Sequence, residues 1–338
     1  MARKGGWRRV GSRGRFTYYD ARGNRITDDA KLERIKALVI PPAWKEVWIS
    51  PSATGKLQAT GIDAAGRRQY LYHPAFRAQQ EQLKYDKLIR FAERLPDLRG
   101  VMAEHMDHDA LDRDRVSAIA TRLINRAWFR VGGERYAKES KTFGITTLTR
   151  RHVRVRGNRV AFHFRAKHRV LVRTTLVDAE IATAMKDLLA LPGRGRLFRY
   201  VEEGERHNLT GHRLNAYIRT NLGDEFTAKD FRTWGGTLTA AIAFAERGPV
   251  ETVTEQKRVV AAVMRRVGEE LGNTPAVARS SYVSPAVVEQ YLDGRTIDDF
   301  RPRHLRVVGA RDMGLDLEEQ ALLSLLRSWK IRTARAAA

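Results

Sequence analysis

Near the middle of the chain lies the stretch Val153-Arg154-Val155-Arg156-Gly157-Asn158-Arg159-Val160-Ala161-Phe162-His163-Phe164. Apolar and polar residues alternate on either side of Gly157-Asn158, which predicts two antiparallel strands joined by a tight turn. A third strand is predicted at residues 170–174, so that Lys167 falls in the tip between the second strand and the third. A small antiparallel sheet is therefore expected inside a chain whose neighbouring segments have helical spacing.

Apolar residues at helical spacing flank this sheet on both sides. On the N-terminal side, one helix is expected from about Pro74 until Pro96 stops it, and another over Val116–Ala127, ending at Arg130. On the C-terminal side, helices are expected at 178–191, 211–221, 228–246 with Gly235-Gly236 as a candidate break, 253–271, 285–292 and 317–329. The last alanines, 336–338, are expected to fray.

The N-terminal segment has a different, mostly β pattern. Strands are predicted at 16–19, 47–49, 56–60 and 67–72, with one short helix from Asp28 or Asp29 to Leu38. The first dozen or so residues, rich in Gly and Arg, are expected to form a mobile arm that touches phosphate. We therefore predict an α+β protein with a small β-rich domain at 1–90 and a larger, mainly α-helical domain at 91–338.

The charge of the chain points to a polyanionic partner. Its 338 residues include 62 Lys and Arg against 39 Asp and Glu, a formal net charge of +23. Such a field favours DNA or RNA, and no long amphipathic basic helix suggests a membrane surface instead. There is no cysteine, which excludes disulfides and thiolate chemistry. No apolar run approaches membrane-spanning length and no apolar segment follows the basic start, so we expect a cytosolic protein.

Five residues on separate elements together have the chemistry of a site that cuts a phosphodiester: Arg130, Lys167, Arg232, Asn273 and Tyr282. A tyrosine attacks phosphorus efficiently only where nearby cations favour its phenolate. Two arginines suit the phosphoryl oxygens, a lysine suits protonation of the leaving 5′ oxygen, and an amide adds a neutral donor. Each residue also has an ordinary interpretation: a solvated loop cation for Lys167, a helix end for Asn273, and surface residues for the others.

A metal site is the alternative suggested by the run His105-Met106-Asp107-His108-Asp109. That run precedes a helix and is better interpreted as a capping, solvated turn, since the proposed chemistry needs no metal. The chain also has no Gly-rich phosphate loop ending in Gly-Lys-Ser/Thr. We therefore expect neither a metal nor a cofactor.

At these residues the chain resembles the small type IB DNA topoisomerases of poxviruses and their bacterial relatives. The resemblance covers nearly the whole length beyond the first dozen residues and rests on specific motifs, which are Gly66–Tyr72, Phe129–Gly132 with Tyr136, the Lys167 tip, Lys229–Thr233, and Asn273–Pro275 through Tyr282. It implies a nucleophile at Tyr282, phosphate-clamping arginines at 130 and 232, a general acid at Lys167 and a transition-state donor at Asn273. Asparagine rather than histidine at position 273 resembles the bacterial branch.

The resemblance also implies contacts to double-stranded DNA and a C-shaped clamp made by the two domains. The implied contact residues are Arg67, Gln69, Tyr70, Tyr72, Tyr136 and Lys229. Gly133 and Arg135 depart from lysines of the viral members, which argues against a viral type of site preference. A monomer acting on the nucleoid in the cytoplasm, with no membrane and no obligate protein partner, is the corresponding expectation.

The implied activity is relaxation of supercoiled DNA through a 3′-phosphotyrosyl intermediate and religation, without ATP or metal. A tyrosine site-specific recombinase is the first alternative. Lys229-Asp230-Phe231-Arg232 opposes it, because recombinases usually carry His-x-x-Arg there, and so does the β-rich first domain. A non-catalytic, basic nucleic-acid-binding protein is the second alternative, and the complete set of five residues argues against it.

Overall fold

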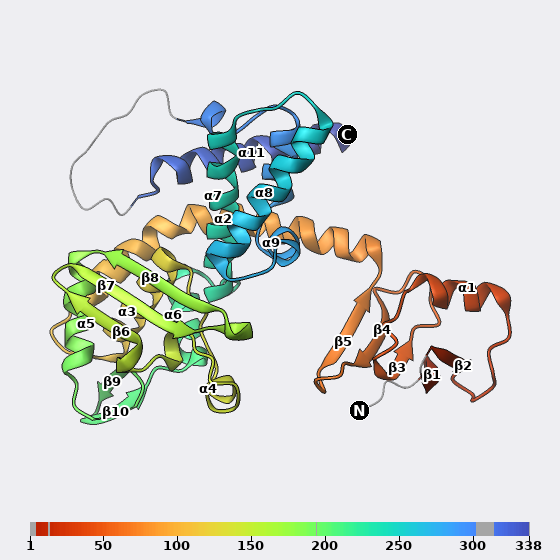
Figure 1. Cartoon of the computed structure of the whole chain (residues 1–338), viewed down its shortest axis with the longest axis horizontal. Helices are drawn as coiled ribbons and strands as arrows, with labels where there is room; N and C mark the ends of the chain where they lie inside the picture. The colour runs from red at the N-terminus through yellow and green to blue at the C-terminus, as the bar shows by residue number, and fades with distance from the viewer. Residues whose placement is uncertain (1–4, 13, 194, 302–313, 338) are drawn as a thin grey trace. The chain divides into compact units, whose positions relative to one another are not determined.

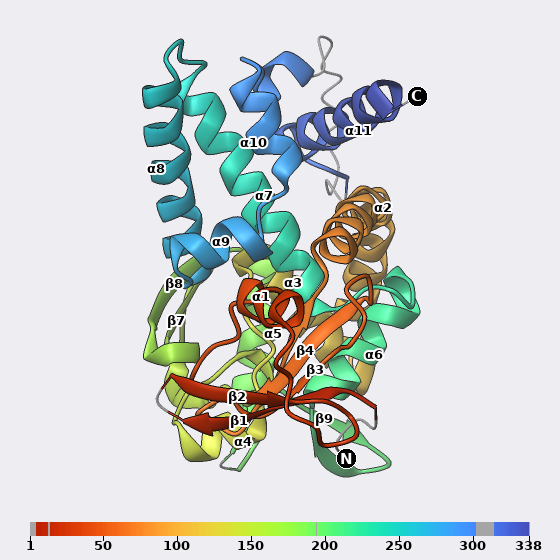
Figure 2. The same cartoon turned by 90° about the vertical axis from the view of Figure 1, so that its right-hand side faces the viewer.

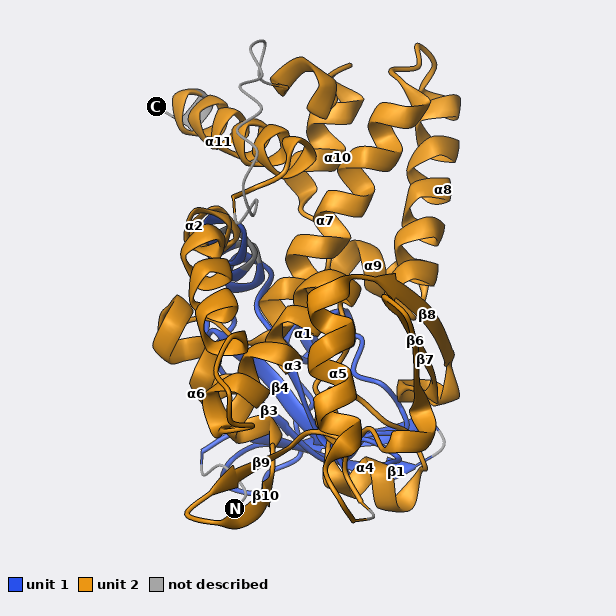
Figure 3. Ribbon diagram, turned by 90° about the vertical axis from the view of Figure 1, so that its left-hand side faces the viewer, with its two compact units in different colours: residues 1–86 blue, residues 87–338 orange. Residues whose placement is uncertain are grey.

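The computed structural model describes residues 5–12, 14–193, 195–301 and 314–337. The chain divides into two compact units, residues 1–86 and residues 87–338, which Figure 3 shows in different colours. Each unit has its own strands and its own buried apolar residues.

Unit 1 is built on a five-stranded antiparallel sheet with the order β2-β1-β3-β4-β5 (Figure 1). Its strands are β1 (Trp7–Ser12), β2 (Arg15–Tyr19), β3 (Lys45–Ile49), β4 (Leu57–Ile62) and β5 (Arg68–Tyr72). Helix α1 (Asp29–Ala37) follows the N-cap Asp28, whose side chain accepts a hydrogen bond from the Lys31 amide. The core of the unit gathers Trp7, Ile26, Ile35, Val47, Ile49 and Ala59.

The expected mobile arm is wrong over residues 7–12. These residues form β1, which pairs with β2 from Arg8↔Tyr19 to Ser12↔Arg15 and with β3 at Trp7↔Ile49. Trp7 is only 7% exposed, so its indole anchors the strand in the core. The arginines of β1 conceal this pattern because one face of an antiparallel strand can be polar while the other is buried. The first four residues, also part of the expected arm, lie outside the described residues.

Unit 2 contains the predicted three-stranded sheet, in the order β6-β7-β8. Its strands are β6 (Val153–Arg156), β7 (Arg159–Arg165) and β8 (Leu171–Val177). Gly157 adopts a φ of 55°, the left-handed conformation that the tight turn between β6 and β7 requires. Val160, Phe162 and Phe164 alternate with exposed or half-buried residues along β7 and are buried. The helix α5 (Ala179–Ala190) packs against β6 and β7.

The rest of unit 2 is mainly helical. The helices are α2 (Pro74–Met106, most of which belongs to this unit), α3 (Arg113–Ala127), α4 (Glu134–Glu139), α6 (Gly211–Leu222), α7 (Ala228–Arg247), α8 (Val253–Leu271), α9 (Pro275–Ser281), α10 (Pro285–Leu292) and α11 (Leu317–Ala337). A short hairpin, β9 (Arg199–Glu202) and β10 (Glu205–Asn208), was not expected from the sequence. Figure 2 shows α7 and α8 side by side, with α9 at the end of α8.

Pro96 does not stop the helix that contains it, contrary to the prediction. Helix α2 runs from Pro74 to Met106 with Pro96 inside it. A proline in a helix interior costs about 3 kcal/mol because it removes a hydrogen bond and crowds the preceding turn. Here Leu95, Leu98 and Met102 are 1% exposed or less, so continued burial of the apolar face offsets that cost.

Gly235-Gly236 does not break helix α7 either. The helix is continuous from Ala228 to Arg247, and both glycines are buried within it. A Cβ on Gly235 would lie 2.3 Å from the Trp128 indole, and one on Gly236 would lie 3.0 Å from the Tyr282 Cβ. The two glycines are therefore places where another segment approaches the helix closely.

The C-terminal helix α11 is fixed to the rest of unit 2 by a buried carboxylate. Glu319, 4% exposed, accepts hydrogen bonds from two nitrogens of Arg99 on α2 at 2.7 and 2.9 Å. It also accepts one from the indole of Trp234 on α7 at 3.0 Å. Burial raises the pKa of Glu319, but the hydrogen bonds and charge of Arg99 and the hydrogen bond of Trp234 lower it by more, so the resulting pKa lies below the ordinary value. The carboxylate thus joins three helices.

The predicted fold class is confirmed: unit 1 is small and β-rich, and unit 2 is larger, mainly helical and carries the three-stranded sheet. Within the described part of the chain, no helix combines the length and the apolar character needed to cross a membrane.

Replacing Glu319 with alanine should destabilise the protein by about 3–5 kcal/mol, because Arg99 would be left as an unpaired charge with 18% side-chain exposure. Chemical denaturation measures this change. Glu93→Ala is the matched control, since Glu93 pairs with Arg327 between the same two helices but both side chains are exposed, at 40% and 53%. It should cost at most about 1 kcal/mol.

The same pair predicts a pH effect. Since the pKa of Glu319 is depressed by folding, its contribution to stability is present above the ordinary Glu pKa and is lost as the pH falls through the lowered value. Glu319→Ala should lack that acid-sensitive component. Equal losses of stability in Glu319→Ala and Glu93→Ala would contradict the assigned role of the buried carboxylate.

Candidate active site

Arg232 is the most buried of the five predicted site residues, with 5% of its surface exposed. It lies in the second turn of α7, whose start is fixed by a capping box between Thr227 and Asp230. Its guanidinium donates a hydrogen bond to the Trp128 carbonyl at 2.5 Å and another to the Leu271 carbonyl at 2.8 Å. Its Nε is also buried, and no described group accepts a hydrogen bond from that nitrogen.

Both acceptors of Arg232 are at the C-terminal ends of helices. Trp128 is the C-cap of α3 in the left-handed conformation, with φ 49°, and Leu271 is the last residue of α8. The final carbonyls of a helix have no partner inside the helix and carry its negative partial charge. Two helix ends therefore supply the hydrogen bonds and the potential that allow a guanidinium to be buried here.

Arg130 lies two residues after Trp128 and contacts the C-terminal end of α8. It donates hydrogen bonds to the Gly272 carbonyl at 2.9 Å and to the Asn273 Oδ1 at 2.7 Å. Burial, together with the charge of Arg232, lowers the pKa of Arg130 to about 10. Because the Asn273 oxygen is engaged by Arg130, its Nδ2 is left as the donor of the amide, with only a 3.4 Å contact to the Leu271 carbonyl.

Tyr282 is half-buried and forms the C-cap of α9, between α9 and α10, each of which begins with a proline. The Arg232 guanidinium lies over its ring, 5.0 Å from the centroid. Burial raises the pKa of Tyr282, but the charges of Arg232, Arg130 and Lys229 lower it by more, so that the net pKa is below the ordinary value. This is the electrostatic setting that a phenolate nucleophile needs.

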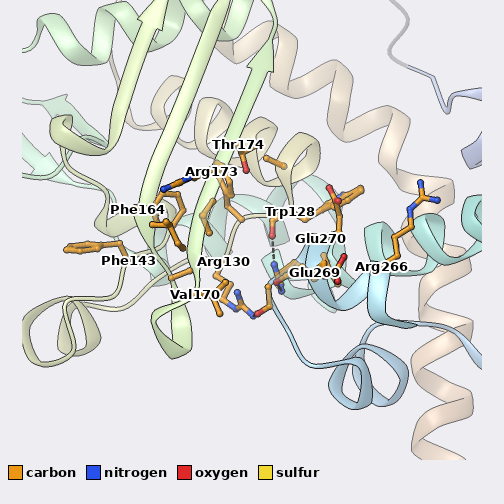
Figure 4. A pocket seen from close by; sticks show the side chains of 18 residues that line it. Trp128, Arg130, Phe143, Phe164, Val170, Arg173, Thr174, Arg266, Glu269 and Glu270 are labelled. Carbon is orange, nitrogen blue, oxygen red and sulfur yellow. Dashed lines mark hydrogen bonds between the residues drawn. The ribbon is translucent and has the colours of Figure 1, made fainter. Parts of the chain in front are cut away.

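Lys167 lies in the tip of the β7–β8 hairpin, as predicted, and its side chain is exposed. Two neighbours in the tip, Ala166 and Val170, line a cavity of about 340 Å³ together with Arg130 and Arg232. Figure 4 shows Val170 beside Arg130 in this cavity. The structure therefore brings the hairpin tip to the arginines without showing a contact of the Lys167 amine with them.

Two of the predicted DNA-contact residues belong to unit 2. Lys229 is exposed, one turn before Arg232 on α7, and contributes to the lowered pKa of Tyr282.

Tyr136 is 61% exposed on α4. Glu134 at the start of this helix pairs with Arg196, which also donates a hydrogen bond to the Thr147 carbonyl at 2.8 Å. The pair attaches the first turn of α4 to the body of the unit.

The other four predicted DNA-contact residues lie on the β4–β5 turn and β5 of unit 1. Tyr70 and Tyr72 are 50% and 42% exposed, with their rings stacked 6.2 Å apart. Arg67 and Gln69 both donate hydrogen bonds to Asp63. The backbone and side chain of Arg67 are the main reason that the pKa of Asp63 falls to about 2. A stacked aromatic pair beside basic residues is a suitable surface for nucleic acid.

The sequence interpretation missed the residues that hold the site together. Trp128 and Leu271 contribute only backbone carbonyls, for which no side-chain pattern exists. Gly235 and Gly236 were interpreted as a candidate break, although two glycines inside a strongly periodic helix are also the signal of close approach. Thr237, fully buried beside them, was not singled out.

Comparison with known proteins gives two family matches. Residues 73–298 match the model of the eukaryotic DNA topoisomerase I catalytic core, and residues 15–63 match that of the bacterial DNA topoisomerase IB N-terminal domain. A DNA topoisomerase 1B of Acanthamoeba polyphaga mimivirus is 31% identical over 285 residues, which is 82% of this chain and 84% of that protein. The DNA topoisomerase 1B of Vaccinia virus (strain Copenhagen) is 21% identical, covering 81% of this chain and 87% of its own length. The DNA topoisomerase 1 of Rabbit fibroma virus (strain Kasza) is 24% identical, covering 85% and 92%.

The electrostatics of the site predict how Tyr282 titrates. In the free protein, the phenolate absorbance lost in Tyr282→Phe should have a midpoint below about 10, the ordinary value for tyrosine. Removing the charge in Arg232→Ala should move that midpoint up. Tyr217 is the control, because burial, with Asp114 and Glu104, raises its pKa and Arg232 is not among the causes. An unchanged midpoint for Tyr282 in Arg232→Ala would show that this arginine does not set its pKa.

Proposed function

The chain belongs to the type IB DNA topoisomerases, a family of isomerases that act on DNA, and we propose that it relaxes supercoils through a transient bond between Tyr282 and a 3′ phosphate. The observation that carries this proposal is the Arg232 guanidinium 5.0 Å from the centroid of the Tyr282 ring, in a site where the charges of Arg232, Arg130 and Lys229 lower the pKa of the tyrosine hydroxyl. A structural tyrosine half-buried in a helix end would have no need of three cations.

In the proposed reaction, the Tyr282 oxygen attacks the scissile phosphorus and the bond from phosphorus to the 5′ oxygen breaks. The proton of the tyrosine leaves, and a proton is delivered to the 5′ oxygen, which departs as a hydroxyl. After the duplex swivels, the 5′ hydroxyl attacks the phosphotyrosine and restores both groups. One phosphodiester replaces another at each step, so the chemistry requires neither ATP nor a metal ion.

The two arginines would stabilise the charge that develops on the non-bridging oxygens. The Arg232 guanidinium lies 5.0 Å from the centroid of the Tyr282 ring, and Arg130 has donors beyond those that it gives to Gly272 and Asn273. Asn273 would add its Nδ2 as a neutral donor, since Arg130 holds the amide oxygen. Electrostatic stabilisation by preorganised donors of this kind is commonly the largest single contribution to an enzyme's rate enhancement.

Lys167 would be the general acid for the 5′ oxygen. It is exposed on a hairpin tip whose neighbours Ala166 and Val170 line the cavity with both arginines, so its four-carbon stem can bring the amine to a bound phosphodiester. His168 and Arg169 beside it adopt positive φ values of 62° and 60°. The tip is therefore a sharp turn, and residues 167–170 in it are exposed.

The remaining predicted residues would contact double-stranded DNA outside the reaction centre. Lys229 and Tyr136 are exposed on unit 2, and Arg67, Gln69, Tyr70 and Tyr72 are on unit 1. Because all five catalytic residues come from a single chain, we propose that the protein acts as a monomer, without an obligate protein partner. It would act in the compartment that contains the genome.

The central test is capture of a covalent protein–DNA adduct that survives denaturation. Wild-type protein should form it and should relax positively and negatively supercoiled plasmid in EDTA without ATP. Tyr282→Phe should form no adduct while binding DNA nearly as well, because only the nucleophilic oxygen is lost. A strict need for magnesium or ATP, or an adduct in Tyr282→Phe, would overturn the mechanism. Activity confined to one defined recombination sequence would favour a tyrosine recombinase instead.

The role of Lys167 has a sharper test. Lys167→Ala should slow cleavage of normal DNA by roughly 10²–10⁴-fold, the range typical of lost proton transfer. A substrate with sulfur at the 5′-bridging position expels a thiolate, which needs little protonation, and should largely restore the rate. Arg232→Ala should be restored less, since sulfur does not replace charge on the non-bridging oxygens. Equal defects of Lys167→Ala on both substrates would reduce Lys167 to a phosphate contact.

A further inference from the structure

Helix α7 holds the backbone of the Tyr282 segment through Thr237. The Thr237 hydroxyl is 3.1 Å from the Tyr282 carbonyl and 2.8 Å from the carbonyl of Thr233, one turn earlier in the same helix. It also accepts a hydrogen bond from the Ser284 amide at 3.2 Å. Thr237 and Ser284 are both 0% exposed, so these contacts are shielded from water.

The hydroxyl has one proton and two carbonyls within reach of it. When the hydroxyl donates to the Tyr282 carbonyl, it contacts the segment at two points, because the Ser284 amide donates to the Thr237 hydroxyl oxygen. When it donates to Thr233, only the Ser284 contact remains. An apolar side chain at this position would leave a buried amide of Ser284 without this partner, which typically costs about 1–3 kcal/mol.

The neighbouring glycine explains why the segment can come so close. A Cβ on Gly236 would lie 3.0 Å from both the Cβ and the carbonyl oxygen of Tyr282, and 3.0 Å from Leu271. Glycine inside a helix costs about 1 kcal/mol relative to alanine. Its presence here gives the Tyr282 backbone direct access to the helix surface.

The same helix carries the cation that faces the nucleophile. Arg232 is four residues before Gly236, so the two lie on one face of α7. Its guanidinium lies over the Tyr282 ring while Gly236 and Thr237 contact the Tyr282 backbone. Helix α7 therefore contacts both the ring and the backbone of Tyr282.

We propose that Thr237 is a positioning residue for the reaction, with Gly236 as its partner: together they fix the Tyr282 backbone so that the hydroxyl is held in register with Arg232. The proposal rests on the function proposed above, because it requires Tyr282 to be the nucleophile. A misplacement of about 1 Å in a reacting group can cost on the order of 10²-fold in rate.

The test compares Thr237→Val and Thr237→Ser in single-turnover cleavage at saturating protein, with DNA affinity measured separately. The valine variant should cleave about ten- to a hundredfold more slowly with DNA affinity unchanged, since it keeps the shape and loses the hydroxyl. The serine variant keeps the hydroxyl and should stay within about threefold of wild type. If valine cleaves at the wild-type rate, or if serine is as slow as valine, the proposal is overturned.

Thr121→Val is the matched control for the loss of a buried helical hydroxyl. Thr121 is also 0% exposed and donates to the carbonyl four residues earlier, on Ser117 at 2.8 Å, but no hydrogen bond links it to the Tyr282 segment. It should lower thermal stability by no more than Thr237→Val does, since it leaves no amide without a partner, and it should leave the cleavage rate unchanged. A loss of rate in Thr121→Val equal to that in Thr237→Val would assign the effect to general destabilisation and overturn the proposal.

Gly236→Ala gives an independent readout should Thr237→Val fail to fold. The added methyl would crowd Tyr282 while alanine favours the helix, so cleavage should slow at least tenfold in a folded protein. Gly100→Ala in α2 is its control, because nothing lies within 4 Å of the added Cβ. Wild-type cleavage by Gly236→Ala would overturn the proposal. An adduct in Tyr282→Phe would instead refute the function on which it rests.

Discussion

The site depends on the burial of one guanidinium, that of Arg232, between the ends of two helices. Moving a cation out of water is costly unless hydrogen bonds and opposite charge replace its hydration. The carbonyls of Trp128 and Leu271 do both, because the last carbonyls of α3 and α8 lack partners in their own helices. Arg130 completes the arrangement on the Gly272 carbonyl. The places where α3 and α8 end therefore determine where the two positive charges stand.

Those helix ends are set by a small number of close contacts. Helix α8 ends at Gly272 in the left-handed conformation that favours glycine, whereas α3 ends at Trp128, which adopts it at a steric cost. The Trp128 indole fits against α7 because Gly235 has no Cβ to meet it. The absence of a side chain at Gly235 thus leaves room for the Trp128 indole. With the indole in place, the Trp128 carbonyl accepts a hydrogen bond from Arg232. The indole of Trp234, the residue before Gly235, donates a hydrogen bond to the buried carboxylate of Glu319, so the C-terminal helix is attached to the same element.

The features that the sequence predicted are those with local signals. Alternation around Gly157-Asn158 predicted the hairpin, and apolar residues at helical spacing predicted α8 and α10. The strand β1 was missed although it pairs locally with β2, because an arginine-rich segment shows no apolar run. Pro96 and Gly235-Gly236 misled for a related reason: both are breakers by propensity, but burial of α2 and close packing on α7 outweigh propensity. Chemistry-bearing side chains can be recognised from their types, whereas the backbone carbonyls that orient them cannot.

The proposed catalytic residues also differ in how firmly they are held. Arg232, Arg130, Asn273 and Tyr282 are linked by hydrogen bonds and a ring contact within a set of helix ends. Lys167 lies instead on an exposed tip followed by two non-glycine residues with left-handed φ, each of which costs about 1–2 kcal/mol. Charge stabilisation gains most from donors that need no rearrangement, because reorganising them would consume the energy they supply. A proton donor must instead reach an oxygen that moves away as its bond to phosphorus breaks. A rigid set of cations with a proton donor on a flexible stem is therefore a division of roles that suits a reaction run in both directions.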